Sequence, residues 1–201
     1  MAHETTSWLD LIRHGEPVGG LRFRGLRDDP LTARGREQLW TAVGEERWEL
    51  IITSPLLRCQ AFAEELGTAR RIPVEVDPRF RELDFGDWEG LAPGEIADQA
   101  AVRRFWSDPV GNGPPGGESA SALLERVNDG LQDWLNRGRG GRLLFVCHGG
   151  VIRAAIAGSL DLPLGSVMQG FQVPYACRTR LRVDHGPHGT LRCLTAHGAS
   201  G

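Results

Sequence analysis

Residues 143–150 read LLFVCHGG, and this stretch sets the fold class. A continuous apolar run such as LLFVC is typical of a central strand in a parallel sheet, where both faces are buried. A second apolar run, WLDLIR at residues 8–13, ends in His14-Gly15 in the same way as the first ends in His148-Gly149. The two stretches predict two buried strands, each with a histidine and a glycine directly beyond its carboxyl end.

Strands and helices alternate outward from these two strands. The residue patterns predict further strands at 50–53 and 72–76 and helices at 32–43, 56–66, 96–106, 118–136 and 151–157. Two alternating runs at 177–184 and 190–196, joined by a turn, predict a closing hairpin. This order predicts an α/β fold, three layers (α/β/α) around a mainly parallel central sheet, and a single domain over residues 1–201.

Composition narrows the chemistry. The formal net charge of -3 gives no bias toward nucleic acid, and 40% apolar and 24% charged residues are ordinary for a globular protein. All 23 basic residues are arginine. The chain therefore has no lysine for a Walker-type phosphate loop, a Schiff base or a general base. Its cationic sites are guanidinium groups, which suit phosphate or carboxylate.

The remaining composition indicates a cytoplasmic location. The four cysteines form no CxxC pair and are expected to be reduced and buried. Neither a signal peptide nor a membrane span is expected, so no membrane partner is predicted.

His185, His188 and His197 lack zinc-like spacing and are expected to be solvent-exposed, so no metal is predicted. Tryptophans such as Trp106 are expected to pack in the core or half-buried against it, and Trp88 to wall a pocket. For Trp106, together with Arg103 and Arg104, two alternatives stay open: contact with an extended ligand, or a place on a surface helix.

The two strand ends predict one site. Ligands of open parallel sheets bind beyond the carboxyl ends of the strands, so His14 and His148 would share a crevice if their strands are neighbours. Arg13 and Arg58, near the ends of the first and second strands, can supply guanidinium groups for a tetrahedral dianion. A lone histidine is more often structural and a lone arginine more often solvated. The repeated strand–His–Gly arrangement favours a functional site.

These residues resemble the histidine phosphatase superfamily, on its phosphoglycerate mutase-like branch. The resemblance covers residues 9 to about 155, in the expected order. It is carried by the following segments: Arg13-His14-Gly15-Glu16, Asp29-Pro30-Leu31-Thr32 with Gly35, Thr53-Ser54-Pro55 with Arg58, Glu82 with Phe85-Gly86 and Trp88-Glu89-Gly90, Gly116-Gly117-Glu118-Ser119, and Val146-Cys147-His148-Gly149-Gly150.

The resemblance implies a role for each matching residue. His14 would be the nucleophile that becomes phosphorylated, and Glu82 the proton donor. Arg13 and Arg58 would hold the phosphoryl oxygens, with His148 and the backbone at Gly149 completing the site. No cofactor or metal is implied, and residues 91–117 would be a variable segment that sets substrate specificity.

One position departs from the family pattern. Family members often carry an asparagine four residues after the glutamate of the RHGE motif, and here that residue is Gly20. Arg22 or Arg24 is a candidate to compensate.

Three functions remain open at this point. The first is a phosphomonoesterase acting on a small phosphorylated metabolite, with α-ribazole 5′-phosphate as the candidate substrate, because the chain looks most like that group of phosphatases. The second is a phosphoglycerate mutase. As a class, the cofactor-dependent mutases resemble longer chains with a larger helical insertion after the glutamate segment, whereas only about thirty residues separate Gly86 from Glu118 here. The third is a non-catalytic module that binds phosphorylated ligands. The sequence leaves the oligomeric state open.

Overall fold

The computed structural model describes residues 5–138, 140–187 and 189–198. Its six-stranded sheet has the order β3-β2-β4-β1-β5-β6. The strands are β1 (Thr5–Arg13), β2 (Leu50–Thr53), β3 (Val74–Val76), β4 (Arg142–Cys147), β5 (Arg178–Gly186) and β6 (Gly189–Gly198). Strands β1 to β4 run parallel to one another, and the antiparallel hairpin β5–β6 joins at the β1 side, which confirms the mainly parallel sheet closed by a hairpin.

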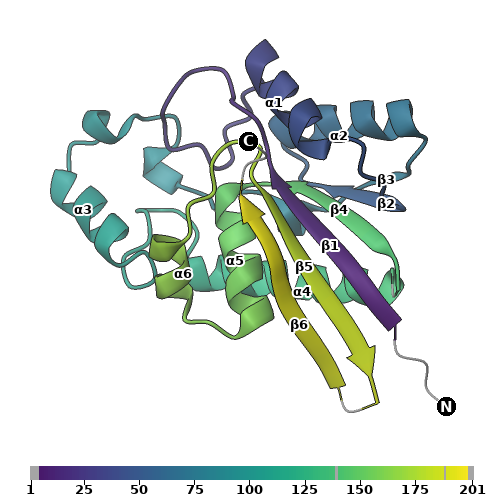
Figure 1. Cartoon of the computed structure of the whole chain (residues 1–201). Coiled ribbons are helices and arrows are strands. Elements are labelled where there is room, and N and C mark those ends of the chain that lie inside the picture. Colours follow the sequence, from purple (N-terminus) through teal and green to yellow (C-terminus); the bar gives the residue numbers. More distant parts are fainter. Residues whose placement is uncertain (1–4, 139, 188, 199–201) are drawn as a thin grey trace.

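Helices cover both faces of the sheet (Figure 1). The helices α1 (Ala33–Val43) and α2 (Leu57–Arg70) pack on one face, and α4 (Ala120–Arg137), α5 (Gly149–Leu160) and α6 (Leu164–Gly170) on the other. Helix α3 (Gln99–Ser107) lies beyond the carboxyl ends of the parallel strands. The three-layer α/β/α prediction is confirmed.

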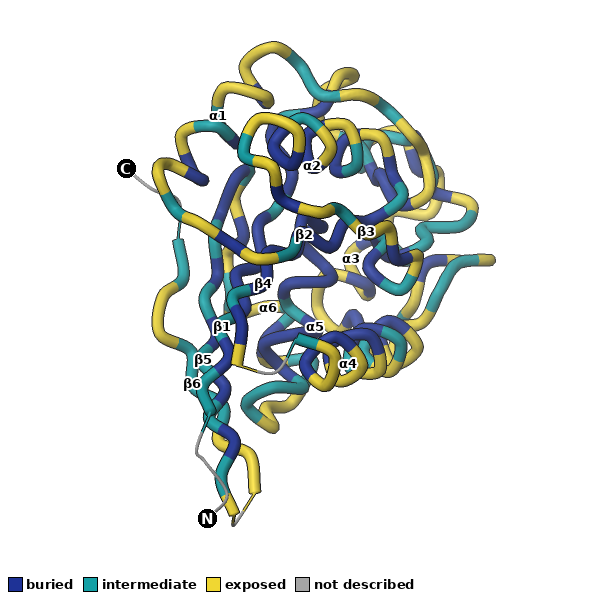
Figure 2. Tube along the Cα trace, turned by 90° about the vertical axis from the view of Figure 1, so that its right-hand side faces the viewer, coloured by how far each residue is buried: buried dark blue, intermediate teal, exposed yellow. Residues whose placement is uncertain are grey.

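The central strand β1 shows why the layers form. Successive side chains of a strand point to opposite faces. Leu9 and Leu11 accordingly join the apolar cluster under α4 and α5, while Ile12 joins the cluster under α1 and α2. Figure 2 shows the resulting buried band along the sheet and the inward faces of the helices.

The structure corrects several predicted boundaries. Strand β1 begins at Thr5 rather than at residue 8, and α2 continues to Arg70 rather than ending at 66. Helix α6 was not predicted, because its seven residues include two glycines and offer little periodicity. Thr32 caps α1 as predicted, since its side chain accepts a hydrogen bond from the Gly35 backbone N–H. Among the residues described, no helix is both long enough and apolar enough to cross a membrane.

Candidate active site

The two strand-end histidines lie together. Strands β1 and β4 are direct parallel neighbours, with Arg13 in register with Cys147, so the residues that follow them meet at one edge of the sheet. The rings of His14 and His148 have centroids 5.2 Å apart. The crevice predicted from the repeated strand–His–Gly pattern is therefore formed by adjacent strands.

The tautomer of His14 follows from its surroundings. Its Nδ1 lies 2.7 Å from the Gly15 carbonyl oxygen, which can only accept, so Nδ1 carries the proton and Nε2 the lone pair. The side chain is only 4% exposed. Burial, together with repulsion from Arg58 and Arg13, lowers its pKa well below the 6.5 of a free imidazole. The ring is thus neutral near pH 7, with Nε2 able to act as a nucleophile.

Close backbone packing fixes the loop that carries His14. A Cβ placed on Gly15 would lie 1.9 Å from the Gly35 carbonyl oxygen, and a Cβ on Gly35 would lie 2.2 Å from the Glu16 carbonyl oxygen. Only glycine fits at both positions. The start of α1 therefore holds the loop after β1 in place.

Two guanidinium groups lie beside the histidines. Arg13 donates from Nη1 to the Val173 carbonyl (2.7 Å) and stacks 4.4 Å from the ring centre of Tyr175. Arg58 is fully buried and donates from Nη1 and Nη2 to the carbonyls of Arg27 and Gly25, both at 2.8 Å. Within the described part of the chain, Nε of each arginine is buried without a hydrogen-bond partner. Each arginine is thus held in place and keeps an N–H for an anion.

His148 is fully buried behind His14. Its Nε2 lies 2.7 Å from the Ser54 hydroxyl, and the Cys59 sulfur lies 3.6 Å from the same nitrogen. Burial, followed by repulsion from Arg58 and from His14, lowers the pKa of His148 well below 6.5. Burial also raises the pKa of the Cys59 thiol to about 12, so this cysteine is a neutral packing group rather than a thiolate.

The carboxylate of Glu82 is held by backbone N–H groups. Its Oε1 accepts from the N–H groups of Leu83 (3.0 Å) and Gly150 (3.2 Å). A Cβ on Gly150 would lie 2.4 Å from this oxygen, so glycine is needed for the carboxylate to reach the first turn of α5. Glu82 therefore faces the histidine site across the N-terminus of that helix.

These groups meet at a cavity of 260 Å³. Of the predicted residues, Arg13, His14, Glu82 and Gly149 line it, together with Gly150. Arg58 and His148 are not among the lining residues, but the charge of Arg58 lowers the pKa of His14, and the His148 ring packs edge-on against the His14 ring. The other lining residues are Leu21, Arg22, Phe23, Arg24, Leu83, Phe85, Pro93, Phe105, Trp106, Arg153, Met168 and Tyr175.

Sequence reasoning missed Arg153 and Tyr175. Arg153 lies one turn into α5, where its Nη1 would be 3.3 Å from a Cβ on Gly149, and its Nε donates to the Phe171 carbonyl. Its spacing of four residues from Gly149 on a predicted helix could have indicated that it faces the same site. Tyr175 comes from the loop before β5, and nothing in its local sequence indicates that it contacts Arg13.

Other sequence expectations are wrong. Trp106 is 59% exposed and lines the cavity, so the core position is wrong, and its alternative as a ligand-contacting residue stays a prediction. Trp88 does not wall the cavity but is buried behind it against Phe23. His185 is buried in β5, with a ring nitrogen 3.2 Å from the Ser7 hydroxyl. His197 is half-buried, and His188 lies outside the described residues. The expectation of free, buried cysteines is confirmed for Cys59, Cys147 and Cys177, whereas Cys193 is free but half-buried.

The buried histidine pair predicts an acid-sensitive stability. Both imidazoles stay neutral in the folded protein, whereas unfolded histidines take up protons below about pH 6.5. The unfolded state therefore binds more protons. As the pH decreases, the free energy of unfolding falls by up to about 1.4 kcal/mol per pH unit for each histidine. We expect urea unfolding between pH 7 and 5 to show this fall. The slope should be smaller in His14→Ala, and equal slopes in the two proteins would contradict the assignment.

Comparison with known proteins places the chain in a family. Residues 9–194 match the histidine phosphatase superfamily (branch 1). The adenosylcobalamin/alpha-ribazole phosphatase of Escherichia coli (strain K12) is 31% identical over 199 residues, which cover 94% of this chain and 95% of that protein. The probable phosphoglycerate mutase GpmB of Klebsiella pneumoniae (strain 342) is 36% identical over 164 residues, 76% of this chain and 74% of that one.

A solved structure of a related phosphatase supports the same family assignment. The native structure of mycobacterial glucosyl-3-phosphoglycerate phosphatase superposes with a TM-score of 0.86 at 29% identity, and the match covers 98% of this chain and all of that one. The predicted phosphoglycerate mutase-like α/β fold is confirmed. The chain therefore belongs to branch 1 of the histidine phosphatase superfamily and is a histidine phosphatase.

Proposed function

We propose that this protein is a metal-independent phosphomonoesterase that acts on a small phosphorylated metabolite through a phosphohistidine at His14. The observation that carries the proposal is the hydrogen bond from His14 Nδ1 to the Gly15 carbonyl, which leaves the Nε2 lone pair available beside Arg13 and Arg58. Phosphoryl transfer needs alignment and charge stabilisation more than covalent chemistry from other groups. The guanidinium groups of half-buried Arg13 and buried Arg58 can supply that alignment and charge.

The reaction has two balanced steps. His14 Nε2 attacks phosphorus, the ester P–O bond breaks, and protonated Glu82 gives its proton to the departing alkoxide. The Glu82 carboxylate then takes a proton from a water molecule whose oxygen attacks the phosphohistidine. The P–N bond breaks, the electron pair returns to Nε2 and inorganic phosphate leaves. Arg13, Arg58 and His148 hold the phosphoryl oxygens in both steps, with the backbone at Gly149.

Hydrolysis of p-nitrophenyl phosphate in the presence of EDTA tests this proposal. We expect undiminished turnover with EDTA and, after rapid quenching, a phosphoenzyme that is labile in acid and stable in base. Turnover that requires a divalent cation would overturn the proposal. Interconversion of phosphoglycerates without net hydrolysis would favour the mutase, and binding of phosphate esters without turnover would favour the non-catalytic module.

α-Ribazole 5′-phosphate is the first substrate to test, because a relative 31% identical to this chain is named for that activity. Glucosyl-3-phosphoglycerate is the second, because the superposed mycobacterial structure is of a phosphatase named for it. If α-ribazole 5′-phosphate is the substrate, its kcat/KM should exceed those of sugar phosphates and phosphoglycerates by orders of magnitude. Equal values across the panel would rule it out as the physiological substrate.

Arg24 is the better candidate to compensate for Gly20. Its Nε pairs with Asp29 at 2.8 Å, and its Nη2 donates to the carbonyls of Val18 and of Gly20 itself. It lines the cavity, and its charge is one of those that lower the pKa of His14. Gly20, with φ +70°, thus supplies a carbonyl that orients Arg24 in place of a side chain that binds phosphate.

We expect Arg24→Gln to lower kcat/KM by about 10- to 100-fold, because an oriented guanidinium beside the phosphoryl group is lost. Arg27→Gln is the matched control, since Arg27 pairs with the same Asp29 but is not among the cavity-lining residues. Steady-state kinetics with p-nitrophenyl phosphate and thermal unfolding of both variants provide the comparison. Equal losses in the two variants would show that Arg24 only stabilises the loop.

A further inference from the structure

Two chemically different sets of side chains line the cavity. The first set, which we call the polar half, comprises His14, Arg13, Glu82, Arg153 and Arg24. The other half is apolar and is formed by six side chains, Leu21, Phe23, Phe85, Phe105, Trp106 and Met168, which we call the apolar wall. The phosphoryl group occupies the polar half in the proposed reaction. The apolar wall is then left for the alcohol portion of the substrate.

Trp106 is the most exposed aromatic member of the apolar wall. It lies near the end of α3 and is 59% exposed, although its ring is held nearly parallel to that of Phe23, with centroids 5.9 Å apart and an interplanar angle of 24°. Leu21, from the loop after β1, is 79% exposed at the same cavity. Large apolar side chains exposed together at a pocket are typical of a binding surface.

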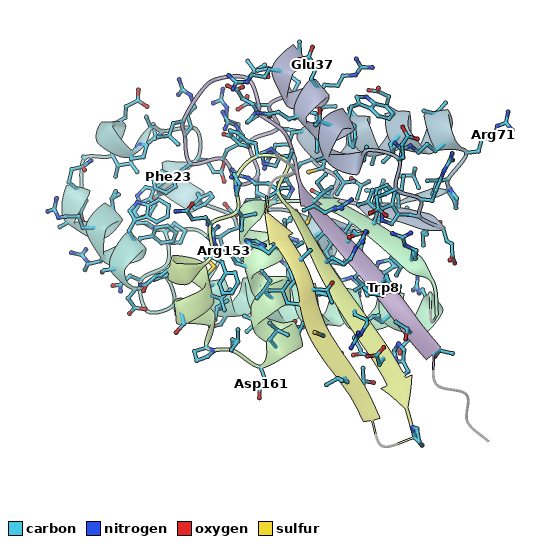
Figure 3. All side chains as sticks on the ribbon, in the orientation of Figure 1. Trp8, Phe23, Glu37, Arg71, Arg153 and Asp161 are labelled. Atoms are coloured by element: carbon cyan, nitrogen blue, oxygen red, sulfur yellow. The ribbon has the colours of Figure 1, made fainter. Side chains whose placement is uncertain are left out.

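The support beneath Trp106 is rigid. Phe23 is 4% exposed and contacts Phe85 and Trp88, each with ring centroids 5.1 Å away. Val102 and Phe105 bury the inner face of α3, and the Phe105 ring packs edge-on against Trp106 at 5.0 Å. Figure 3 shows Phe23 on the same side of the molecule as Arg153, which marks the polar half. A fixed aromatic surface thus lies next to the phosphoryl site.

This surface discriminates between kinds of alcohol. A planar ring system can stack on Trp106 and lose little hydration. A hydroxyl-rich group placed there would lose hydrogen bonds to water, and its hydroxyls need new partners. Arg22, which also lines the cavity, already donates its Nε to the Gly19 carbonyl and its Nη1 to the Gly90 carbonyl. The wall therefore favours planar apolar groups over sugars.

We infer that the substrate is the phosphomonoester of an alcohol that carries a planar apolar ring system, and that Trp106, supported by Phe23, is the residue that selects it. The inference rests on the proposed phosphomonoesterase function and names the substrate class for that same site. It assigns a specificity role to a residue within the variable segment 91–117.

Three esters of primary alcohols test this inference, because their leaving groups are alike and only the attached group differs. They are naphthalen-2-ylmethyl phosphate (planar, apolar), cyclohexylmethyl phosphate (apolar, not planar) and glucose 6-phosphate (hydroxylated). We expect kcat/KM to fall in that order, by about 100-fold from first to last. In Trp106→Ala the ratio of the first to the last should fall about tenfold, which corresponds to the loss of one aromatic contact.

The ratio of two kcat/KM values is independent of the fraction of enzyme that is correctly folded, so partial misfolding of a variant cannot imitate the result. Trp106→Phe should restore most of the ratio. Leu191→Ala, which removes an apolar side chain 62% exposed on β6, should leave it unchanged. Equal kcat/KM values in the wild type, or an unchanged ratio in Trp106→Ala, would overturn the inference alone. If none of the three esters is hydrolysed, the proposed function is overturned, and the inference with it.

Discussion

His14→Ala should lower phosphatase turnover by about 10⁴-fold or more, because no other group can form the covalent intermediate in the proposed mechanism. The expected loss appears in kcat with p-nitrophenyl phosphate and EDTA present. The phosphoenzyme should be missing from quenched reactions at every substrate concentration. Inorganic phosphate should still bind, although more weakly, because Arg13 and Arg58 remain in place.

His185→Ala is the control for this variant. It also removes a buried histidine, but His185 pairs with Thr5 at the opposite end of β1 from His14. We expect it to keep turnover within a few-fold of the wild type when both are assayed below their unfolding temperatures. If His14→Ala kept more than about one hundredth of the wild-type turnover, His14 would not be the nucleophile.

Glu82→Gln should produce a loss that depends on the leaving group. The amide oxygen of glutamine can still accept from the N–H groups of Leu83 and Gly150, so the geometry is kept while proton exchange is lost. For alkyl phosphates, whose alkoxide needs a proton, we expect kcat/KM to fall by about 10³-fold. For p-nitrophenyl phosphate the fall in kcat/KM should be much smaller, because the phenolate leaves without a proton.

The second step gives this variant a further measurable property. Without the carboxylate, the attack of water on phosphohistidine slows, so stopped-flow measurements should show a burst of one p-nitrophenolate per active site before slow turnover. Glu125→Gln, on the exposed side of α4, is the matched control and should show no burst. An equal loss for alkyl and p-nitrophenyl phosphates in Glu82→Gln would assign Glu82 to positioning rather than to proton transfer.

The His14→Ala and Trp106→Ala variants test the mechanism and the specificity inference separately. In the proposed mechanism His14 and Glu82 act on the phosphoryl group and on the bridging oxygen, which all monoesters share. In the inferred specificity role Trp106 would contact only the part of the substrate that differs. A change in the kcat/KM ratio between naphthalen-2-ylmethyl phosphate and glucose 6-phosphate is therefore expected for Trp106→Ala and not for His14→Ala, whose residual rates should be low with both esters.

The sequence by itself determined the strand–His–Gly units and the alternation of strands and helices. Both follow from local patterns, since an apolar run buries a strand and a following glycine permits a close backbone approach. The same patterns placed Arg13, His14, His148 and Gly149 at strand ends and Arg58 just beyond the second strand, and the family motif added Glu82. In each case the information lies within a few consecutive residues.

Only the tertiary structure decided which distant segments share the cavity. The adjacency of β1 and β4, which brings His14 to His148, depends on strand order, and no local pattern encodes strand order. Tyr175 meets Arg13 across more than 150 residues of chain, and Trp106 reaches the cavity because Val102 and Phe105 bury the other face of α3. A tryptophan in a helical pattern indicates packing in general. Whether it packs inward or lines a pocket is set by the surface that its helix meets, and that surface comes from elsewhere in the chain.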